Sequence, residues 1–397
     1  MAHILPRGFQ FGGVHCGIKK NPRKEDIALI TCPRGAVAAG VYTRNLVYAA
    51  PVAFDRARTP SADMRVIAVN SGNANACTGE RGLRDAERMA QLATEACGFQ
   101  AGQALVMSTG IIGVFLPMEK IEAGFQACAG QLGNDEDSFM AAARGICTTD
   151  KSTKTTSREV TIGGTTYRIA GMCKGAGMIG PNMATLLGVI TTDARLTPSA
   201  AQEVLFETVE QSFNCISVEG HMSTNDTVLL LASGEASAEP LTGEQLAQFK
   251  QALLEMAIEL ATQIPDDGEG STHLIEIEVR GTRTRDEART IASTIADSAL
   301  VKTAISGGDP NWGRIVSAAG YAGVPFNPNG VGLSINGHEI YRNGSPHSFE
   351  ARVVSQSIKE SRRTHLLLTL TEGQAGIKFW TSDLTVEYVK FNADYST

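Results

Sequence analysis

Apolar residues recur at helical spacing in six stretches of the chain. Within each stretch they fall three or four positions apart, which places them on one face of a helix. We therefore expect helices over residues 82–97, 118–132, 138–147, 199–213, 243–264 and 284–296. The fifth follows Thr242-x-x-Gln245, a capping-box sequence that predicts a side-chain hydrogen bond at the first turn.

Runs of β-branched and aliphatic residues alternate with these helices and predict strands. We expect strands over residues 64–70, 159–162, 167–171, 227–232 and 274–279, then 332–335, 338–341, 366–370 and 376–381. Two pairs are linked by the tight turns Gly163-Gly164 and Asn336-Gly337, and such short links join only antiparallel strands. The pattern favours an α+β protein of layered helices and sheets over a doubly wound parallel sheet.

The length and composition indicate a globular protein that acts on small molecules. With 397 residues the chain exceeds what one core usually holds, so we expect two domains or two closely packed halves. A formal net charge of −7 provides no basic surplus for a nucleic-acid backbone, so we expect no nucleic-acid partner. The apolar runs are too short to span a membrane, and no secretion signal is recognisable at the N-terminus, so we expect a cytoplasmic protein.

The eight cysteines and seven histidines are scattered along the chain. They form no C-x-x-C pair, no H-E-x-x-H pattern and no other ligand spacing that is typical of a zinc site. We therefore expect free thiols and no metal.

The densest local signal is the string KGAGMIGPNMAT at residues 174–185. Its G-x-G-x-x-G portion matches the dinucleotide fingerprint, but the next residues, LLGVITT, do not read as the full helix that a nucleotide-binding unit needs. We favour a reactive bond between Ala184 and Thr185, around which the glycines allow close backbone approach. On the residues alone, a plain glycine-rich turn into a buried strand remains an alternative.

A threonine at this bond has a specific chemistry. If the Thr185 hydroxyl attacks the preceding carbonyl, an N-to-O acyl shift followed by hydrolysis cuts the chain and frees an α-amino group. Such a group has a pKa of about 7.7 to 8.0, so a usable fraction is neutral at physiological pH. The neutral amine can act as the base that activates the hydroxyl of the same residue.

The string KGAGMIGPNMATLLGVITTDA resembles the glutamate N-acetyltransferase/ornithine acetyltransferase family of arginine biosynthesis, whose members cleave themselves before the Thr of a Met-Ala-Thr motif. The likeness extends from Arg7-Gly-Phe to the last residue. Further family-like segments are SGNANACTG at 71–79, STGIIG at 108–113, TTD at 148–150, STNDT at 223–227, DGEG at 267–270 and GDPNWGR at 308–314.

The resemblance implies a two-step acetyl transfer. Thr185 would take acetyl from N-acetylornithine, release ornithine, and pass the acetyl group to glutamate. Self-cleavage between Ala184 and Thr185 would give an α chain of residues 1–184 and a β chain of residues 185–397, assembled as a heterotetramer. The implied fold is the αββα layered arrangement shared with self-processing aminopeptidases.

No metal or redox cofactor is implied, and acetyl-CoA is a second acetyl donor only in the bifunctional branch of the family. Two other functions remain open. A self-processing aminopeptidase would use the same nucleophile with water as acceptor, and a non-catalytic binding protein would keep the fold without cutting itself.

The resemblance also assigns the site residues. The Thr109 hydroxyl and the Gly110 backbone N–H would form the oxyanion hole that acyl transfer requires. Substrate binding would use Thr148, Lys174, Thr185, Glu269, Asn392 and Thr397. Lysine, hydroxyl and amide donors suit the α-carboxylates of the substrates, and a glutamate suits the cationic amine of ornithine. Without the family resemblance, Lys174 and Glu269 would be interpreted as solvated surface charges, and Thr397 would be interpreted as a frayed chain end.

One segment departs from the family pattern. Where the family commonly has Asp-Gly-Asp-Thr before STND, this chain has Glu219-Gly-His-Met222. An imidazole thus replaces a carboxylate, which puts a local polar contact or the substrate preference in question, and we expect His221 to be structural. Other family-like polar residues are left out of the predicted site, because such loop residues more often bond backbone groups. These are Asn225, Asp226, Asp309, Asn311 and Arg314.

Overall fold

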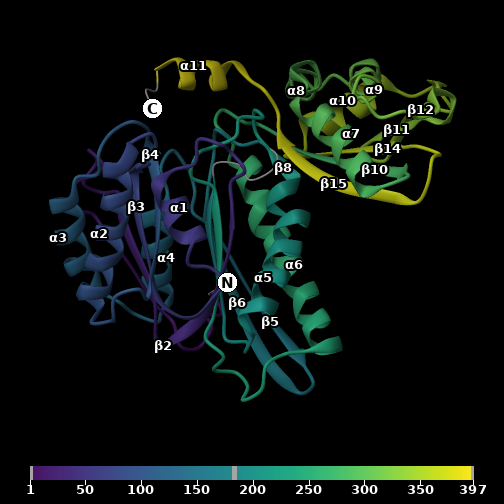
Figure 1. The fold of residues 1–397 in the computed structure, drawn as a ribbon. Coiled ribbons are helices and arrows are strands. Elements are labelled where there is room, and N and C mark those ends of the chain that lie inside the picture. Colours follow the sequence, from purple (N-terminus) through teal and green to yellow (C-terminus); the bar gives the residue numbers. More distant parts are fainter. Residues whose placement is uncertain (1–2, 181–185, 395–397) are drawn as a thin grey trace.

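The computed structural model describes residues 3–180 and 186–394 of the chain. These residues form a large lobe on an eight-stranded sheet and a smaller lobe on a seven-stranded sheet (Figure 1). The last helix, α11 (Val386–Asp394), returns from the small lobe and lies over the top of the large one. The chain therefore brings its C-terminal segment back to the half of the molecule where it began.

The first sheet has the strand order β4-β3-β2-β9-β7-β6-β5, with β1 beside β2. Its strands are β1 Gln10–Val14, β2 Ile27–Tyr42, β3 Ser61–Asn73, β4 Ala104–Ile111, β5 Lys154–Ile162, β6 Thr165–Lys174, β7 Leu187–Thr192 and β9 Thr227–Ala232. The helices of this lobe are α1 Ala50–Arg56, α2 Gly79–Cys97, α3 Met118–Ala129, α4 Glu136–Ile146, α5 Pro198–Gln211 and α6 Gly243–Asp266.

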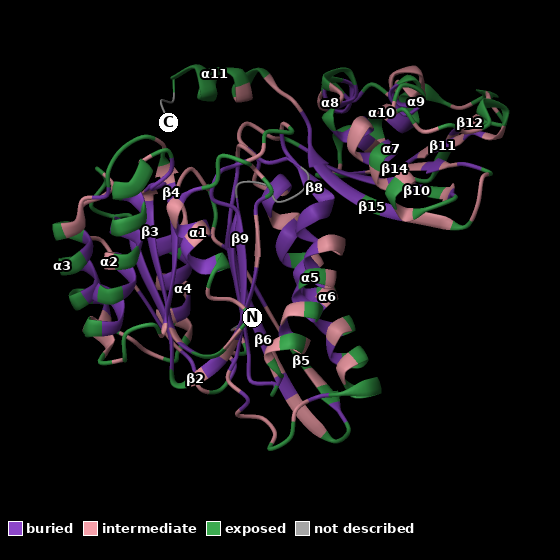
Figure 2. Ribbon diagram, in the orientation of Figure 1, coloured by how far each residue is buried: buried purple, intermediate pink, exposed green. Residues whose placement is uncertain are grey.

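Alternation of side chains along the strands decides which helices cover which face. In β2, Ala28 and Ile30 pack in one cluster with residues of α4, whereas Ile27 and Leu29 pack on the opposite face with residues of α2 and α3. At the other end of the sheet, α5 and α6 supply the residues that pack on the face opposite α4. Figure 2 shows the central strands of this lobe, such as β3 and β9, largely buried between these helices, whereas β5 at the edge of the sheet is partly exposed.

The second sheet has the order β13-β12-β11-β14-β10-β15-β8. Its strands are β8 Ile216–Ser217, β10 Leu274–Thr282, β11 Gly332–Ile335, β12 His338–Arg342, β13 Ser345–Pro346, β14 Arg363–Thr369 and β15 Ala375–Ser382, and its helices are α7 Arg285–Asp297, α8 Ala299–Ser306, α9 Trp312–Gly320 and α10 Ala351–Lys359. Ile275, Ile277 and Val279 of β10 belong to the same buried cluster as Phe249 and Leu253 of α6. The two lobes therefore share one core.

The predicted α+β class is confirmed, and both sheets are mixed. The tight turns after residues 162 and 335 do join antiparallel neighbours, β5–β6 and β11–β12. Four other pairs are parallel, namely β3–β4, β7–β9, β10–β14 and β8–β15. All six predicted helices are present, and α4 begins after Asp135 because the carboxylate of that residue accepts a hydrogen bond from Ser138 N at 2.8 Å.

The capping box was wrong, because Thr242 does precede α6 but its side chain makes no capping hydrogen bond. The predicted chain division between residues 184 and 185 falls between β6 and β7, outside the described residues. It does not separate the two lobes, since β6 and β7 are neighbours in the first sheet.

The contact between β1 and α4 gives a test of the packing. A Cβ atom on Gly13 would lie 2.0 Å from the Ala141 carbonyl oxygen, which is backbone and cannot turn aside. We expect Gly13→Ala to lower the free energy of unfolding by about 1 to 3 kcal/mol, measured by urea titration. Gly320→Ala is the control, because nothing lies within 4 Å of a Cβ there. Equal stability of the two variants would contradict this packing.

Candidate active site

A cavity of about 90 Å³ lies where the ends of several strands of the first sheet meet the loops around them. Within the described part of the chain it is lined by Ala74, Thr109, Gly110, Ile112, Thr148, Thr149, Lys174, Gly177, Met178, Ser223, Thr224, Asn225, Glu269 and Asn392. Six of these were predicted from the sequence, namely Thr109, Gly110, Thr148, Lys174, Glu269 and Asn392. The remaining predicted residues, Ala184, Thr185 and Thr397, lie outside the described residues.

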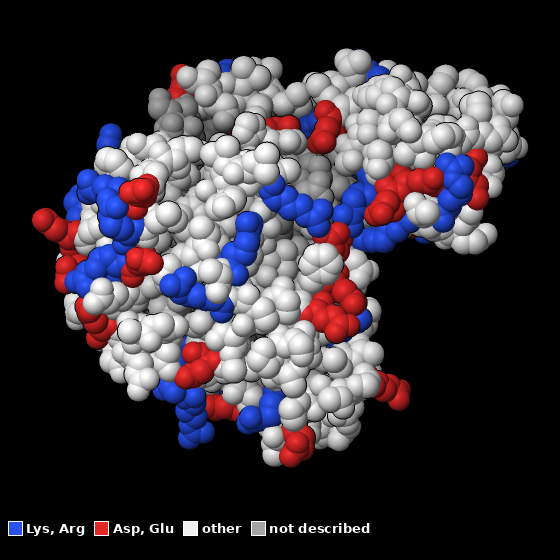
Figure 3. Space-filling view, viewed as in Figure 1, with Lys and Arg blue, Asp and Glu red and all other residues white. Residues whose placement is uncertain are grey.

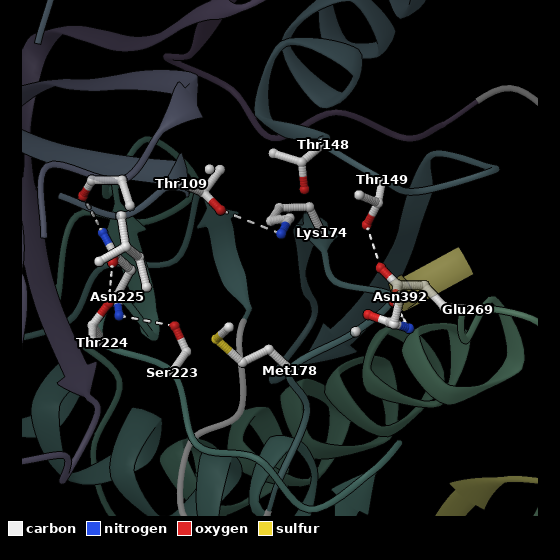
Figure 4. A pocket seen from close by; sticks show the side chains of 14 residues that line it. Thr109, Thr148, Thr149, Lys174, Met178, Ser223, Thr224, Asn225, Glu269 and Asn392 are labelled. Atoms are coloured by element: carbon white, nitrogen blue, oxygen red, sulfur yellow. Dashed lines mark hydrogen bonds between the residues drawn. The ribbon is translucent and has the colours of Figure 1, made fainter. Parts of the chain in front are cut away.

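The six residues come from five separate parts of the chain, as Figure 4 shows for the labelled side chains. Thr109 and Gly110 lie near the end of β4, and Lys174 is the last residue of β6. Thr148 follows α4, Glu269 follows α6, and Asn392 lies on α11. Folding of both lobes is therefore needed to assemble the cavity.

The end of β4 is held very close to β3. Gly110 has a φ of +134°, and a Cβ atom there would lie 2.2 Å from the carbonyl carbon of Gly72. Only glycine fits such a backbone conformation at such a distance. The neighbouring Thr109 is 3% exposed, and its hydroxyl faces the cavity (Figure 4). The Thr-Gly pair is thus fixed by the sheet at the cavity wall.

Lys174 is a buried cation at the cavity. Its residue is 3% exposed, so it is not the solvated surface charge that it would be on its sequence alone. Its ammonium donates a hydrogen bond to Thr109 Oγ1 at 3.3 Å, the one side-chain partner found among the described residues. An ammonium carries three N–H donors, and a buried charge is costly unless it is paired. The cavity therefore suits an anionic ligand at this end.

Glu269 supplies the opposite charge. Its carboxylate accepts hydrogen bonds from the Thr149 hydroxyl at 2.9 Å and from Asn392 Nδ2 at 3.1 Å. Its backbone N–H donates to the Ala176 carbonyl at 2.9 Å. A Cβ atom on Gly177 would lie 2.4 Å from the same carboxylate, so this glycine allows the acid to approach the turn after Lys174. One cavity thus holds a cation and an anion.

The family-like polar residues outside the prediction mostly bond backbone groups, as expected. Asn225 lines the cavity, but its Nδ2 donates to the Ala74 carbonyl at 2.7 Å and the Ser108 carbonyl at 2.8 Å, so it joins the ends of the strands. Asn311 caps α9 by accepting a hydrogen bond from Arg314 N. Thr149 is one of the lining residues that were not predicted from the sequence, although it lies inside the TTD segment.

Asp226 anchors the chain just after Thr185. Its Oδ1 accepts a hydrogen bond from Leu186 N at 3.1 Å, and the next residue, Thr227, donates its N–H to the Leu186 carbonyl. Complete burial raises the pKa of the Asp226 carboxyl well above its ordinary value. Leu187 pairs with Lys174 in the β6–β7 ladder. The chain therefore enters β7 beside the cavity lysine.

The segment that departs from the family pattern lies next to the turn that precedes the predicted cleavage bond. The Glu219 carboxylate accepts a hydrogen bond from Ile179 N at 2.6 Å, and burial raises the pKa of this carboxyl to about 8. His221 is exposed and is not among the cavity residues. The imidazole therefore stands at the surface, whereas the carboxylate two residues earlier is the buried polar group.

One group of potential metal ligands exists among the described residues, away from the cavity. Glu276, Glu278 and His365 offer ligand atoms within 4.8 Å of one another on the second sheet. Glu276 is already paired with Arg363 and Lys378, and Glu278 is paired with His365 and a neighbouring arginine. Figure 3 shows acidic and basic residues alternating along this side of the small lobe. The two glutamates thus form a row of ion pairs, in which basic side chains already occupy the carboxylate oxygens that a metal ion would need.

Comparison with known proteins decides the family. The model of the ArgJ family matches residues 10–397. The chain belongs to the ArgJ family. The arginine biosynthesis bifunctional protein ArgJ of Rhodopirellula baltica is 48% identical over 399 residues, a match that covers 100% of this chain and 97% of the relative. The protein of the same name from Symbiobacterium thermophilum is 43% identical, with 99% and 98% covered.

Among solved structures, the ArgJ crystal structure from Bacillus halodurans matches with a TM-score of 0.50 and 40% identity. The match covers 52% of this chain and 97% of that chain. The predicted resemblance and the layered α+β fold are therefore confirmed, and the protein is an acyltransferase of arginine biosynthesis. No helix within residues 3–180 and 186–394 is both long and apolar enough to cross a membrane.

The close approach at Gly110 gives a test of the oxyanion donors that were predicted from the sequence. Gly110→Ala adds a Cβ atom that overlaps Gly72, so the Thr-Gly pair must move. We expect the rate of acetyl transfer to fall by about 10² to 10³, as when one oxyanion donor is lost. Gly113→Ala is the control, since it has a similarly positive φ of +79° but no atom within 4 Å of its Cβ. A near-normal rate in Gly110→Ala would refute the assignment.

The buried Glu219 predicts a pH dependence of stability. Its pKa in the folded protein is about 8, above the ordinary value of 4.5. Between these two pH values the folded protein keeps a proton on Glu219 that the unfolded chain has lost. The stabilisation is complete below about pH 4.5 and is lost as the pH rises through about 8. We expect Glu219→Gln to keep the Ile179 hydrogen bond and to flatten this decline, measured as unfolding free energy between about pH 5 and 9.

The control for this measurement is Glu80→Gln, because the Glu80 side chain is 93% exposed. That variant should follow the pH profile of the unchanged protein. If Glu219→Gln follows it as well, Glu219 is not the group that titrates.

Proposed function

We propose that the protein transfers the acetyl group of N-acetylornithine to glutamate through an acetyl ester on Thr185, giving ornithine and N-acetylglutamate. The observation that carries the proposal is the charge pair in the cavity, with Lys174 buried at one side and Glu269 at the other. Ornithine derivatives and glutamate each carry an α-carboxylate for which Lys174 is a suitable partner. Glu269 is a suitable partner for the side-chain amine of ornithine.

The proposed oxyanion hole consists of the Thr109 hydroxyl and the Gly110 N–H. Both lie at the cavity wall, and the sheet fixes them before any substrate binds. Preorganised donors of this kind stabilise the negative charge that develops on the carbonyl oxygen during acyl transfer.

Self-cleavage between Ala184 and Thr185 is the second part of the proposal, giving an α chain of residues 1–184 and a β chain of residues 185–397. The β6–β7 and β2–β9 ladders would hold the two chains together, because each ladder joins a strand from either side of the cut. The Bacillus halodurans crystal chain corresponds to about half of this one, as one product of such a cut would.

The reaction is then a double displacement. The Thr185 oxygen attacks the acetyl carbon of N-acetylornithine while its proton passes to the freed α-amino group of the same residue. The carbon–nitrogen bond breaks, the leaving nitrogen takes that proton, and ornithine departs. The α-amino nitrogen of glutamate next attacks the ester carbon. Its proton returns through the same amine to the threonine oxygen as the carbon–oxygen bond breaks.

The same family assignment leads us to propose a second acetyl donor, an assembly of chains and chemistry without a cofactor. We propose acetyl-CoA as a second acetyl donor, since both relatives are named bifunctional. We further propose a cytoplasmic heterotetramer of two α and two β chains, and chemistry that uses no metal or redox cofactor. The aminopeptidase alternative would leave the opposed charges of Lys174 and Glu269 without an amino-acid acceptor to bind.

A denaturing gel and a transfer assay test the two parts separately. The unchanged protein should give two bands, and Thr185→Ala one full-length band, because the hydroxyl that attacks the preceding carbonyl is gone. Thr290→Ala, on the surface of α7, is the control and should be cleaved normally. Labelled N-acetylornithine with glutamate should give labelled N-acetylglutamate.

A single band from the unchanged protein would remove the free-amine mechanism. Two bands without labelled N-acetylglutamate would refute the transferase assignment but leave the nucleophile in place.

A further inference from the structure

Lys154 is a second buried lysine near the cavity, but it does not line it. Its side chain is 1% exposed at the start of β5. Its ammonium donates to Asp150 Oδ1 at 2.7 Å, to Asp267 Oδ2 at 2.6 Å and to the Ser152 carbonyl at 3.3 Å. These three bonds account for all of its donors, so Lys154 has none left for a ligand.

Asp150 connects this ammonium to two of the substrate-binding segments. Its Oδ2 accepts a hydrogen bond from Thr148 N at 2.9 Å, and its Oδ1 also accepts one from Gly175 N at 2.7 Å. Gly175 directly follows Lys174. One buried carboxylate therefore holds the backbone of Thr148 and the peptide next to Lys174.

Asp267 connects the same ammonium to a third segment. It lies two residues before Glu269, and its Oδ2 accepts hydrogen bonds from Lys151 N at 3.0 Å and Ser152 N at 3.3 Å. Glu269 is in turn joined to the first two segments, through the Thr149 hydroxyl and the Ala176 carbonyl. Lys154 thus stands at the junction of all three.

The charges of this group depend on one another. Burial alone would raise the pKa of Asp150, but the ammonium groups of Lys154 and Lys174 hold it well below its usual range. Burial alone would lower the pKa of Lys154, but Asp150 and Asp267 raise it. Asp150 and Lys154 therefore stabilise each other's charged forms. Removal of one partner from such a buried group leaves an uncompensated charge, which is strongly destabilising locally.

We propose that Lys154, with Asp150 and Asp267, is a positioning group that sets the relative placement of Thr148, Lys174 and Glu269 for substrate binding. The inference rests on the proposed function of those three residues. The oxyanion pair at the end of β4 is held instead by its pairing with β3, which does not involve Lys154. Loss of Lys154 should therefore weaken substrate binding much more than it slows the chemical step.

The test is Lys154→Met in the self-cleaved protein, which keeps an unbranched side chain but removes the charge. We expect KM for N-acetylornithine and for glutamate to rise about tenfold to a hundredfold, as displaced binding groups would cause. The value of kcat should stay within about threefold of the unchanged protein, since the pairing of β4 with β3 holds the backbone of both oxyanion donors. Calorimetric titration with ornithine should show a matching loss of affinity.

The matched control is Arg289→Met. Arg289 is a mostly buried cation of α7, paired with Glu210 at 2.8 Å and absent from the cavity lining. It should lose stability while keeping its KM values and its ornithine affinity. Equal rises of KM in both variants would mean that general destabilisation, not positioning, is being measured, and would overturn the proposal.

A second variant keeps the test decisive if Lys154→Met does not fold. Asp267→Asn leaves the pair between Lys154 and Asp150 intact, so we expect a smaller rise of KM with kcat unchanged. Normal KM and normal ornithine affinity in the folded variant would overturn the proposal.

If the proposed transferase function is wrong, the outcome differs from the one expected if only the positioning role is wrong. The unchanged protein would then form no N-acetylglutamate. The ornithine titration would still decide whether Lys154 positions the cavity residues. Weaker binding by the variant than by the unchanged protein supports the role. Equal binding by the two, or no ornithine binding by the unchanged protein, overturns it.

Discussion

The buried ammonium of Lys174 is the constraint on which the rest of the cavity depends. A cation that is 3% exposed needs compensation, and Thr109 is the one side chain among the described residues that bonds it directly. Asp150 accepts a hydrogen bond from the N–H of Gly175, the residue after Lys174, and contributes a stabilising charge. Under the proposed function, the carboxylate of an amino-acid substrate would accept hydrogen bonds from the remaining donors of Lys174. This requirement joins the architecture of the fold to the chemical class of its substrates.

The first sheet explains how the proposed cut in the middle of the chain would leave this arrangement intact. The predicted cut falls between β6 and β7, which are neighbouring strands with Lys174 paired to Leu187. Asp226 and Thr227 hold Leu186 by its N–H and its carbonyl. The residue that would become the new N-terminus is thus followed at once by anchored backbone. A free amine formed there would be confined near the cavity, as a base acting on its own hydroxyl requires.

Much of the fold could be predicted from sequence, and so could six of the residues that line the cavity, but the contacts between them could not. Helices such as α6 were predictable because their apolar spacing is local. The parallel pairing of β7 with β9 was not, because it depends on which distant strands meet. The motifs named Lys174 and Glu269, yet their local sequence suggested surface charges. Lys154 went unnoticed for the same reason, since its partner Asp267 lies 113 residues further along the chain.

The most direct test of the central claim is the mass of the peptide that begins at Thr185. The protein is incubated with N-acetylornithine alone, stopped in acid and digested. The account predicts an acetyl ester on the Thr185 oxygen that disappears when glutamate is added, with N-acetylglutamate formed in equal amount. An unmodified Thr185 peptide in protein that still makes N-acetylglutamate, or an acetyl group on the α-amino nitrogen instead, would contradict it.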